Sequence, residues 1–366
     1  MIIGVLKEPS NETRVSLLPE AVSALTKKGN TVFIEQGSGV QAFASDDDYK
    51  QAGATVCDKA TVISSSEILL SIHPDPVADI TSKILIGVYF PLIQSQFNTA
   101  WAQAGNTVFS LDMLPRTTRA QSMDILSSQA NIAGYKAVLL AASSYARYFP
   151  MFMTAAGSIA PAKMLILGAG VAGLQAIATA RRLGSVVEVF DTRPAVKEEV
   201  QSLGAKFIEV EGAADASKAG GYAVEQSDEF KAKQQARIAE SAAKADIIIT
   251  TAQIPGKKAP ILITQAMLDT MRKGSIIIDL AASTGGNTPL TKNNETIVYN
   301  GISIIGNSNL AATMPSDASK LYGKNIMNFL HIITGEGQSI NLNFEDELVK
   351  GSCITHGGKI IHERLL

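Results

Sequence analysis

A glycine-rich segment constrains the fold of this chain more than any other feature. Residues 168–173 read Gly-Ala-Gly-Val-Ala-Gly. The apolar run 163–167 precedes them with the composition of a strand, and residues 172–183 follow with the spacing of a helix. In this order of strand, turn and helix, the glycines let the backbone approach a pyrophosphate, and the helix N-terminus offers amide groups to its charge. The segment therefore predicts a Rossmann-type domain that binds a dinucleotide.

Each glycine of the segment has its own task in such a turn. Gly168 permits the tight turn, Gly170 lets the backbone approach the pyrophosphate, and Gly173 lets the helix pack closely on the strand. Val171 stands between them and is counted with them as a cofactor-binding residue. Glycine triplets also arise by chance in a chain with 29 glycines, so the flanking strand and helix carry the prediction.

An acidic residue follows at the position where a ribose is usually bound. The apolar run 186–190 ends at Asp191, close to the spacing of about 20 residues expected for such an acid. Its carboxylate would accept bonds from ribose hydroxyls and repel a 2′-phosphate, which favours NAD(H) over NADP(H). Arg193 argues the other way, because a nearby arginine can accommodate that phosphate. The alternative without a ligand is that the glycines only shape a turn and Asp191 caps a helix.

Short runs rich in β-branched residues alternate with helical patterns along the chain, which predicts an α/β fold with parallel sheets. We expect two Rossmann-like doubly wound domains, because 366 residues exceed what one core usually holds. The first domain is expected to be discontinuous, 1–126 plus 316–366, with the NAD(H)-binding domain, 127–315, inserted into it. Long helices at 122–148 and 314–330 are expected to join the two.

Strands are expected at 2–6, 31–35, 68–72, 84–88, 107–110, 247–251, 275–280 and 302–305. The stretch 211–245 has few large apolar residues, so we expect part of it to form an exposed helix and part a mobile loop.

Composition and charge exclude several classes of protein. The net charge of −2 and the pI near 6.1 give no basic field for nucleic acid. No apolar run approaches the roughly 20 residues of a membrane helix, and the N-terminus shows no signal peptide, so a cytoplasmic protein is expected. Cys57 and Cys353 are far apart and the four histidines lack ligand spacing, so neither a disulfide framework nor a metal site is predicted. The lack of a G-x-S-x-G motif argues against a covalent hydrolase.

Two polar clusters lie outside the glycine segment. The first, 7–16, reads as a solvated loop at the end of a predicted strand. The second, 115–124, allows two interpretations. In one, Ser122 or Asp124 caps the following helix and the arginines are surface charges. In the other, a carboxamide, a carboxylate and a guanidinium on the segment between the two domains hold a nicotinamide carboxamide and its ribose.

Together with the glycine segment, these clusters resemble the alanine dehydrogenase and pyridine nucleotide transhydrogenase superfamily over essentially the whole chain. One signature appears as Gly-Val-Leu-Lys-Glu at 4–8 and Glu-Thr-Arg-Val at 12–15, and another runs from Gly168 to Asp-Thr-Arg-Pro at 191–194. The resemblance is closest to the NAD(H)-binding alpha subunits of proton-translocating transhydrogenases. It implies NAD(H) on this chain, NADP(H) on a partner subunit, and direct hydride transfer between them that is coupled to proton translocation across the membrane.

The resemblance also implies site residues. A loop that orients the dihydronicotinamide of NADH toward NADP+ is matched at Arg116, Gln121 and Asp124, followed by Ser127, and a mobile loop at 220–223 is implied to close over the nucleotide. The implied catalytic residues are Arg116, Gln121, Asp124, Ser127 and Tyr222. The implied cofactor-binding residues are Gly168, Gly170, Val171, Gly173, Asp191, Thr192, Arg193, Gly221, Gln234 and Gln253.

The two branches of the superfamily need different residues. Alanine dehydrogenases use a lysine in the segment that matches 70–74, a histidine near 88–90 and an aspartate in the segment that matches 280–286. This chain has neither the lysine nor the histidine, and Ser283 stands in place of the aspartate. A transhydrogenase subunit is therefore favoured, with an amino-acid dehydrogenase like alanine dehydrogenase and a non-catalytic NAD-binding protein as the alternatives. His73 matches neither pattern, and a structural or surface role is expected for it.

Partners follow from the same resemblance. Many alpha subunits continue into membrane helices, whereas this sequence resembles the split type, a separate subunit that docks on membrane components. We therefore expect a homodimer, membrane-spanning partner subunits with their NADP(H)-binding domain, and a peripheral place on the inner face of the cell membrane.

Overall fold

The computed structural model describes residues 1–74, 80–210, 212 and 227–366. These residues form two compact units, which we call unit 1 and unit 2. Unit 1 comprises Met1–Gln129 and Ala312–Leu366, and unit 2 comprises Ala130–Ala311. The domain limits expected from the sequence, after 126 and before 316, fall within a few residues of these limits.

Unit 1 is built on an eight-stranded sheet. Its strands are β1 (Ile2–Val5), β2 (Thr31–Glu35), β3 (Thr55–Cys57), β4 (Ile68–Leu70), β5 (Ile84–Gly87), β6 (Thr107–Ser110), β16 (Cys353–His356) and β17 (Lys359–Ile360). They lie in the order β17-β16-β6-β5-β4-β1-β2-β3, and β1 to β6 pair in parallel. The order reverses between β1 and β4, and in open α/β sheets ligands bind at the carboxyl ends of the strands at such a switch point.

The helices of unit 1 start at local sequence signals. They are α1 (Pro19–Lys27), α2 (Asp46–Gln51), α3 (Lys59–Ser65), α4 (Gln96–Gln103), α10 (Pro315–Ile332) and α11 (Glu347–Ser352). Pro19 opens α1, and a capping box between Ser45 and Asp48 opens α2. The buried face of α10 packs on the sheet, where the rings of Phe329 and Phe109 have centroids 5.2 Å apart.

Unit 2 contains a seven-stranded sheet. Its strands are β9 (Lys163–Leu167), β10 (Val186–Phe190), β11 (Lys206–Phe207), β12 (Ile247–Thr250), β13 (Ile276–Asp279), β14 (Glu295–Tyr299) and β15 (Ile302–Gly306). They lie in the order β11-β10-β9-β12-β13-β15-β14, and β14 alone among these seven is antiparallel to its neighbour. The switch point of this sheet lies between β9 and β12. The sequence analysis did not predict β14, whose residues Glu-Thr-Ile-Val-Tyr are rich in β-branched side chains but mostly exposed.

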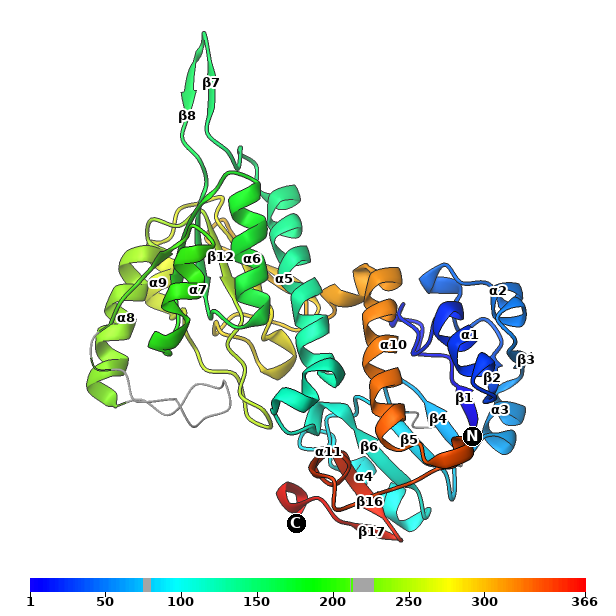
Figure 1. Ribbon diagram of the computed structural model, residues 1–366. Coiled ribbons are helices and arrows are strands. Elements are labelled where there is room, and N and C mark those ends of the chain that lie inside the picture. The colour runs from blue at the N-terminus through cyan, green and yellow to red at the C-terminus, as the bar shows by residue number, and fades with distance from the viewer. Residues whose placement is uncertain (75–79, 211, 213–226) are drawn as a thin grey trace. The chain divides into compact units, whose positions relative to one another are not determined.

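Helices cover the sheet of unit 2 (Figure 1). They are α5 (Ile125–Ser144), which begins in unit 1, α6 (Val171–Arg182), α7 (Lys197–Ser202), α8 (Asp228–Ala242) and α9 (Gln265–Thr270). The helix expected at 122–148 is thus shorter at both ends. The expected exposed helix is present as α8, and the neighbouring stretch 213–226 lies outside the described residues.

A two-stranded hairpin, β7 (Phe152–Thr154) with β8 (Gly157–Ile159), projects from the body of unit 2 (Figure 1). The sequence did not predict it, because strands of three residues are too short to show an alternating pattern. Among the described residues, no helix is long and apolar enough to cross a bilayer, and no group of potential ligands for a metal ion is found. Both cysteines are free thiols.

Candidate functional site

The glycine turn follows β9 at the switch point of unit 2. Gly168 has a φ of +107°, a left-handed conformation that favours glycine. A Cβ atom added to Gly168 would lie 2.3 Å from Oγ1 of Thr251, and one added to Gly173 would lie 1.9 Å from the carbonyl oxygen of Gly168. The packing of this chain alone therefore requires glycine at both positions.

Gly170 differs from the other two glycines, because a Cβ added there would meet nothing within 4 Å. Its φ of −77° is also one that any residue can adopt. Gly170 immediately precedes α6, whose N-terminus has no side-chain cap, and Val171 in the first turn is 38% exposed. Open space in front of an uncapped helix N-terminus fits a pyrophosphate held by main-chain amides.

Asp191 ties the glycine turn to the end of β10. Its side chain is 6% exposed, and its Oδ2 accepts a hydrogen bond of 2.7 Å from the backbone N–H of Ala169. The guanidinium of Arg193 donates to both carboxylate oxygens, from Nε to Oδ1 at 2.9 Å and from Nη2 to Oδ2 at 2.7 Å. Thr192 lies half-buried between the two. The carboxylate thus binds the glycine turn and Arg193, and it does not cap a helix as the alternative interpretation proposed.

This pairing bears on the choice between the two nucleotides. The hydrogen bond to Asp191 is the largest cause that raises the pKa of Arg193. The guanidinium is thus charged and already bound to an opposite charge. In this arrangement Arg193 partly neutralises the acid and is not presented as an isolated cation for a 2′-phosphate.

A buried amide that the sequence did not single out organises the loop after β12. Asn287 is fully buried, and its Nδ2 donates to the carbonyl oxygens of Ala252 at 2.9 Å and Pro260 at 2.8 Å. Its Oδ1 accepts from the backbone N–H of Ala252 at 3.2 Å, so the main chain is held on both sides just before Gln253. The side chain of Gln253 itself is exposed and donates to the carbonyl oxygen of Leu280 at 2.9 Å. The only sequence signal for this turn is the pair of glycines, Gly285 and Gly286, that precedes Asn287.

The other site residues expected in unit 2 are Gln234, Gly221 and Tyr222. Gln234 lies on the buried face of α8 with Phe230 and Ile238, and is 7% exposed. Gly221 and Tyr222, expected on the loop that closes over the nucleotide, lie outside the described residues.

The expected Arg-Gln-Asp segment of unit 1 forms the short 3₁₀ helix η3 (Thr118–Met123) and its flanks. Asp124 accepts from the backbone N–H of Ser127 at 2.9 Å and from its hydroxyl at 2.6 Å, so Asp124 caps α5. The capping interpretation is therefore confirmed for Asp124. Gln121 and Arg116 are exposed, whereas Asp124 and Ser127 are half-buried and joined to each other.

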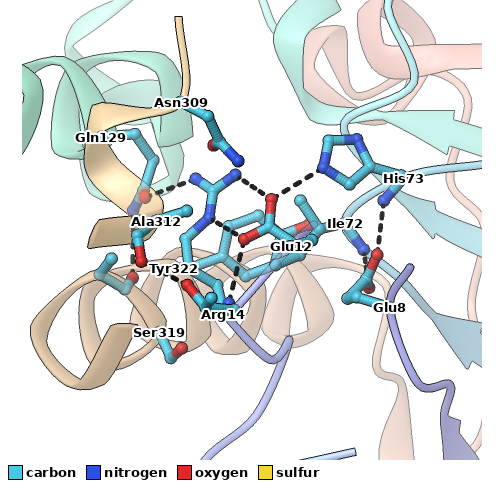
Figure 2. Close-up of polar contacts among 12 residues, drawn as sticks. Glu8, Glu12, Arg14, Ile72, His73, Gln129, Asn309, Ala312, Ser319 and Tyr322 are labelled. Atoms are coloured by element: carbon cyan, nitrogen blue, oxygen red, sulfur yellow. Dashed lines mark hydrogen bonds and ion pairs between the residues drawn. The ribbon is translucent and has the colours of Figure 1, made fainter. Parts of the chain in front are cut away.

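A charged network occupies the switch point of unit 1 (Figure 2). Glu8 follows β1, and its two oxygens accept from the backbone N–H groups of Ile72 at 2.5 Å and His73 at 3.2 Å, just after β4. Glu12 accepts from Nε2 of His73 at 2.8 Å and from Nη2 and Nε of Arg14 at 2.6 and 2.8 Å. Figure 2 shows His73 between the two acids, with its main chain toward Glu8 and its ring toward Glu12.

The prediction of a solvated loop at 7–16 is wrong for the acids and the arginine in this network. Glu8, Glu12 and Arg14 are 7%, 3% and 8% exposed. Burial raises the pKa of Glu8 to about 7. Burial opposes ionisation of Glu12 as well, but the hydrogen bonds from Arg14 and His73 lower its pKa to about 2. The structural role expected for His73 agrees with its bond to Glu12.

Comparison with known proteins identifies the family. The profile described as alanine dehydrogenase/PNT, N-terminal domain, matches residues 4–133, and the profile described as alanine dehydrogenase/PNT, C-terminal domain, matches residues 137–363. The chain belongs to the alanine dehydrogenase/PNT family. The prediction of an NAD-binding, Rossmann-like oxidoreductase of this family is therefore confirmed.

Within the alanine dehydrogenase/PNT family, transhydrogenase subunits are highly similar to this chain. In Rickettsia prowazekii, the protein named as the first part of NAD(P) transhydrogenase subunit alpha is 43% identical over 99% of this chain and 96% of its own length. The protein of the same name from Rhodospirillum rubrum is 43% identical over 100% of this chain and 99% of its own length. The structure of a transhydrogenase from Sinorhizobium meliloti superposes with a TM-score of 0.90 at 43% identity, over 99% of this chain and 100% of that chain.

Alanine dehydrogenases are more distant members of the same family. The enzyme from Mycolicibacterium smegmatis is 26% identical over 99% of this chain and 95% of its own length. The segment at 70–74 has no lysine, the segment at 88–90 has no histidine, and Ser283 stands where the aspartate of that branch was expected. His73 lies within the first of these segments, but its imidazole is bound to Glu12.

Proposed function

We propose that this chain is the NAD(H)-binding alpha subunit of a proton-translocating transhydrogenase, which passes a hydride directly between NADH on this chain and NADP+ on a partner subunit. The observation that carries the proposal is the glycine turn of unit 2. There, an open space over Gly170 faces an uncapped helix N-terminus at the switch point of the sheet. Relatives named as transhydrogenase alpha subunits, at 43% identity over nearly the full chain, supply the reaction class.

The residues of the turn have the chemistry that NAD(H) requires. Main-chain amides at the start of α6 would hold the pyrophosphate, with Gly170 leaving room for it. Asp191 would accept a ribose hydroxyl at the end of β10 while it continues to bind Ala169. The main chain at Ala252 and Gln253, fixed by Asn287, offers further polar groups beyond β12.

Direct hydride transfer needs no protein acid, base or nucleophile. When NAD(H) is bound, its nicotinamide supplies the hydride chemistry, and the protein contributes orientation and exclusion of water. Gln121 is exposed and presents a carboxamide, and we propose that it pairs with the carboxamide of the nicotinamide. Asp124 and Ser127 bind each other, so we assign them to holding this segment at the start of α5. Arg116 and Tyr222 are proposed to support the same site.

We also propose that the chain forms a homodimer through the hairpin of β7 and β8. Met151, Phe152 and Met153 are 61%, 42% and 73% exposed, and Tyr148 stacks on Phe152 with ring centroids 4.9 Å apart. An isolated two-stranded hairpin is at best marginally stable in water, and both of its edges offer unpaired main-chain groups. Members of the family are expected to be dimers. A second copy of this chain would cover both the apolar side chains and the edges.

The membrane partners follow from the same assignment. Relatives named as one part of a divided alpha subunit imply further subunits, and the alpha subunit of Cereibacter sphaeroides matches 98% of this chain over only 71% of its own length. We propose that membrane-spanning subunits and their NADP(H)-binding domain dock on this chain at the inner face of the membrane, and that NADP(H) is bound there.

One reconstitution tests the proposed reaction. The purified chain is mixed with the NADP(H)-binding domain of a related transhydrogenase, and hydride transfer from NADH to thio-NADP+ is followed optically. Rapid transfer that requires both proteins is the expected result. NADH binding without transfer, together with turnover of NAD+ and L-alanine by the chain alone, would instead establish an amino-acid dehydrogenase.

A further inference from the structure

Helix α10 reaches the segment that carries Gln121 and Asp124 through one buried amide. We propose that Asn325 is a positioning residue for hydride transfer, which fixes the main chain of this segment in the geometry that the reaction needs. The inference rests on the proposed function, in which Gln121 and Asp124 lie at the nicotinamide.

Asn325 joins the two sides of the junction between η3 and α5. Its side chain donates from Nδ2 to the carbonyl oxygen of Ser122 at 2.8 Å and accepts at Oδ1 from the hydroxyl of Ser128 at 2.8 Å. Ser122 lies between Gln121 and Asp124, and Ser128 lies in the first turn of α5. This one side chain, 7% exposed, therefore binds both the loop and the first turn of the helix.

The position of this asparagine in the helix is unusual. Around position 325, the buried face of α10 presents large apolar or aromatic side chains, Ile326, Phe329 and Leu330 among them. Asparagine is a poor helix former, and its amide is costly to bury without partners. Packing alone would favour an apolar residue, so the two hydrogen bonds explain why an amide stands at 325.

The segment that Asn325 holds has little stability of its own. It is a 3₁₀ helix of six residues, a form with weaker hydrogen-bond geometry than the α-helix, and Thr117 before it makes no side-chain cap bond. Beyond it, Gln129 is held by Nη1 of Arg14 at 2.8 Å and binds the carbonyl oxygen of Ala318 at 3.1 Å. The orientation of the segment therefore depends on bonds from outside it.

A neighbouring residue provides a matched control. Asn328 lies one helical turn further along α10 and donates from Nδ2 to the same carbonyl oxygen of Ser122, also at 2.8 Å. Asn328 is exposed, and no bond from it to α5 is found among the described residues. Loss of the amide at 328 should leave Ser122 held by Asn325, whereas loss of the amide at 325 removes the one side chain that binds both Ser122 and Ser128.

The expected effect is on the rate of hydride transfer rather than on NADH binding. A mutation far from the reacting atoms that misplaces them by about 1 Å can lower the rate by about 100-fold. We expect Asn325→Asp to slow single-turnover transfer by about 10- to 100-fold, because a carboxylate oxygen replaces the donor to Ser122. The affinity for NADH should be unchanged, because the glycine turn that binds it belongs to unit 2.

The experiment measures three quantities for Asn325→Asp, Asn325→Leu and Asn328→Asp. They are the single-turnover rate from NADH to thio-NADP+ with the partner domain, the NADH dissociation constant from fluorescence, and the midpoint of thermal unfolding. In Asn325→Asp the rate relative to wild type should recover as the pH falls, because a protonated carboxyl can again donate to Ser122. Asn328→Asp should transfer at close to the wild-type rate.

Two outcomes overturn the inference in different ways. Wild-type rates in both variants at 325, or a loss of rate matched by an equal loss of NADH affinity, would refute the role of Asn325 and leave the proposed function intact. Absence of transfer by the wild-type chain itself would refute the proposed function and the inference with it. If Asn325→Leu fails to fold, the nearly isosteric Asn325→Asp and its pH dependence decide the question.

Discussion

Replacing Glu8 by glutamine is expected to remove a pH dependence from the stability of unit 1. Glu8 is 7% exposed, and burial is the main reason that its pKa is raised from 4.5 to about 7. Between these values the folded chain keeps a proton that the unfolded chain has already released. Stability should therefore fall as the pH rises across this range.

The size and direction of the effect follow from the two pKa values. A difference of about 2.5 units corresponds to on the order of 3 kcal/mol in the free energy of unfolding. Because folding raises this pKa, the contribution is fully present below pH 4.5 and is lost as the pH rises through 7. Glu12 has a lowered pKa of about 2, so its contribution is present above pH 4.5 and is lost as the pH falls through 2. The two ranges do not overlap.

The assay can be confined to unit 1. Trp101, the only tryptophan of the chain, lies in α4 and is 8% exposed, so its fluorescence reports the unfolding of that unit in urea. Between pH 5 and pH 7, the free energy of unfolding of the wild type should fall relative to that of Glu8→Gln, by most of the difference worked out above. Glu20→Gln, which removes an exposed carboxylate from α1, should keep the wild-type slope. Parallel curves for the wild type and Glu8→Gln would refute the reasoning.

Three further predictions concern the nucleotide turn, the nicotinamide and the dimer. Gly170→Ala should leave stability unchanged, since its Cβ meets nothing within 4 Å, but weaken NADH binding in a fluorescence titration. Gly173→Ala, with its Cβ 1.9 Å from a carbonyl oxygen, should cost about 1–3 kcal/mol in urea unfolding, and equal costs for both variants would contradict this contrast. Gln121→Asn should slow hydride transfer far more than it weakens NADH binding, and equal losses would argue against an orienting role. Serine at both Phe152 and Met153 should convert a dimer to a monomer in sedimentation velocity, and a monomeric wild type would refute the proposed dimer.

Local patterns were enough to predict the nucleotide-binding half of the fold. The strands at 163–167 and 186–190 have the limits expected from the sequence, because β-branched runs and a glycine turn are short-range signals. The hairpin at 152–159 gave no such signal, because strands of three residues are too short to show an alternating pattern. The edge strand β14 was missed as well, and its side chains are mostly exposed.

The polar residues of unit 1 could not be interpreted from the sequence alone. Glu8 and Glu12 look like solvated charges in a loop, and only the fold brings His73, more than sixty positions away, between them. Asn325 is likewise 203 positions from Ser122, the residue whose carbonyl oxygen it binds. A sequence pattern reports which side chains are polar, but burial of a polar side chain depends on partners that are distant in the chain.

The two sheets show why one nucleotide site is proposed rather than two. Both units have the same reversal of strand order, and so each has a switch point at which a ligand could bind. In unit 1 that place is taken by Glu8, Glu12 and Arg14, whose charges are paired or bonded within the chain. In unit 2 the corresponding place has an open space over Gly170 and an uncapped helix. Unit 1 is therefore less suited than unit 2 to bind a dinucleotide, and under the proposed function its contribution to the reaction is the segment that carries Gln121.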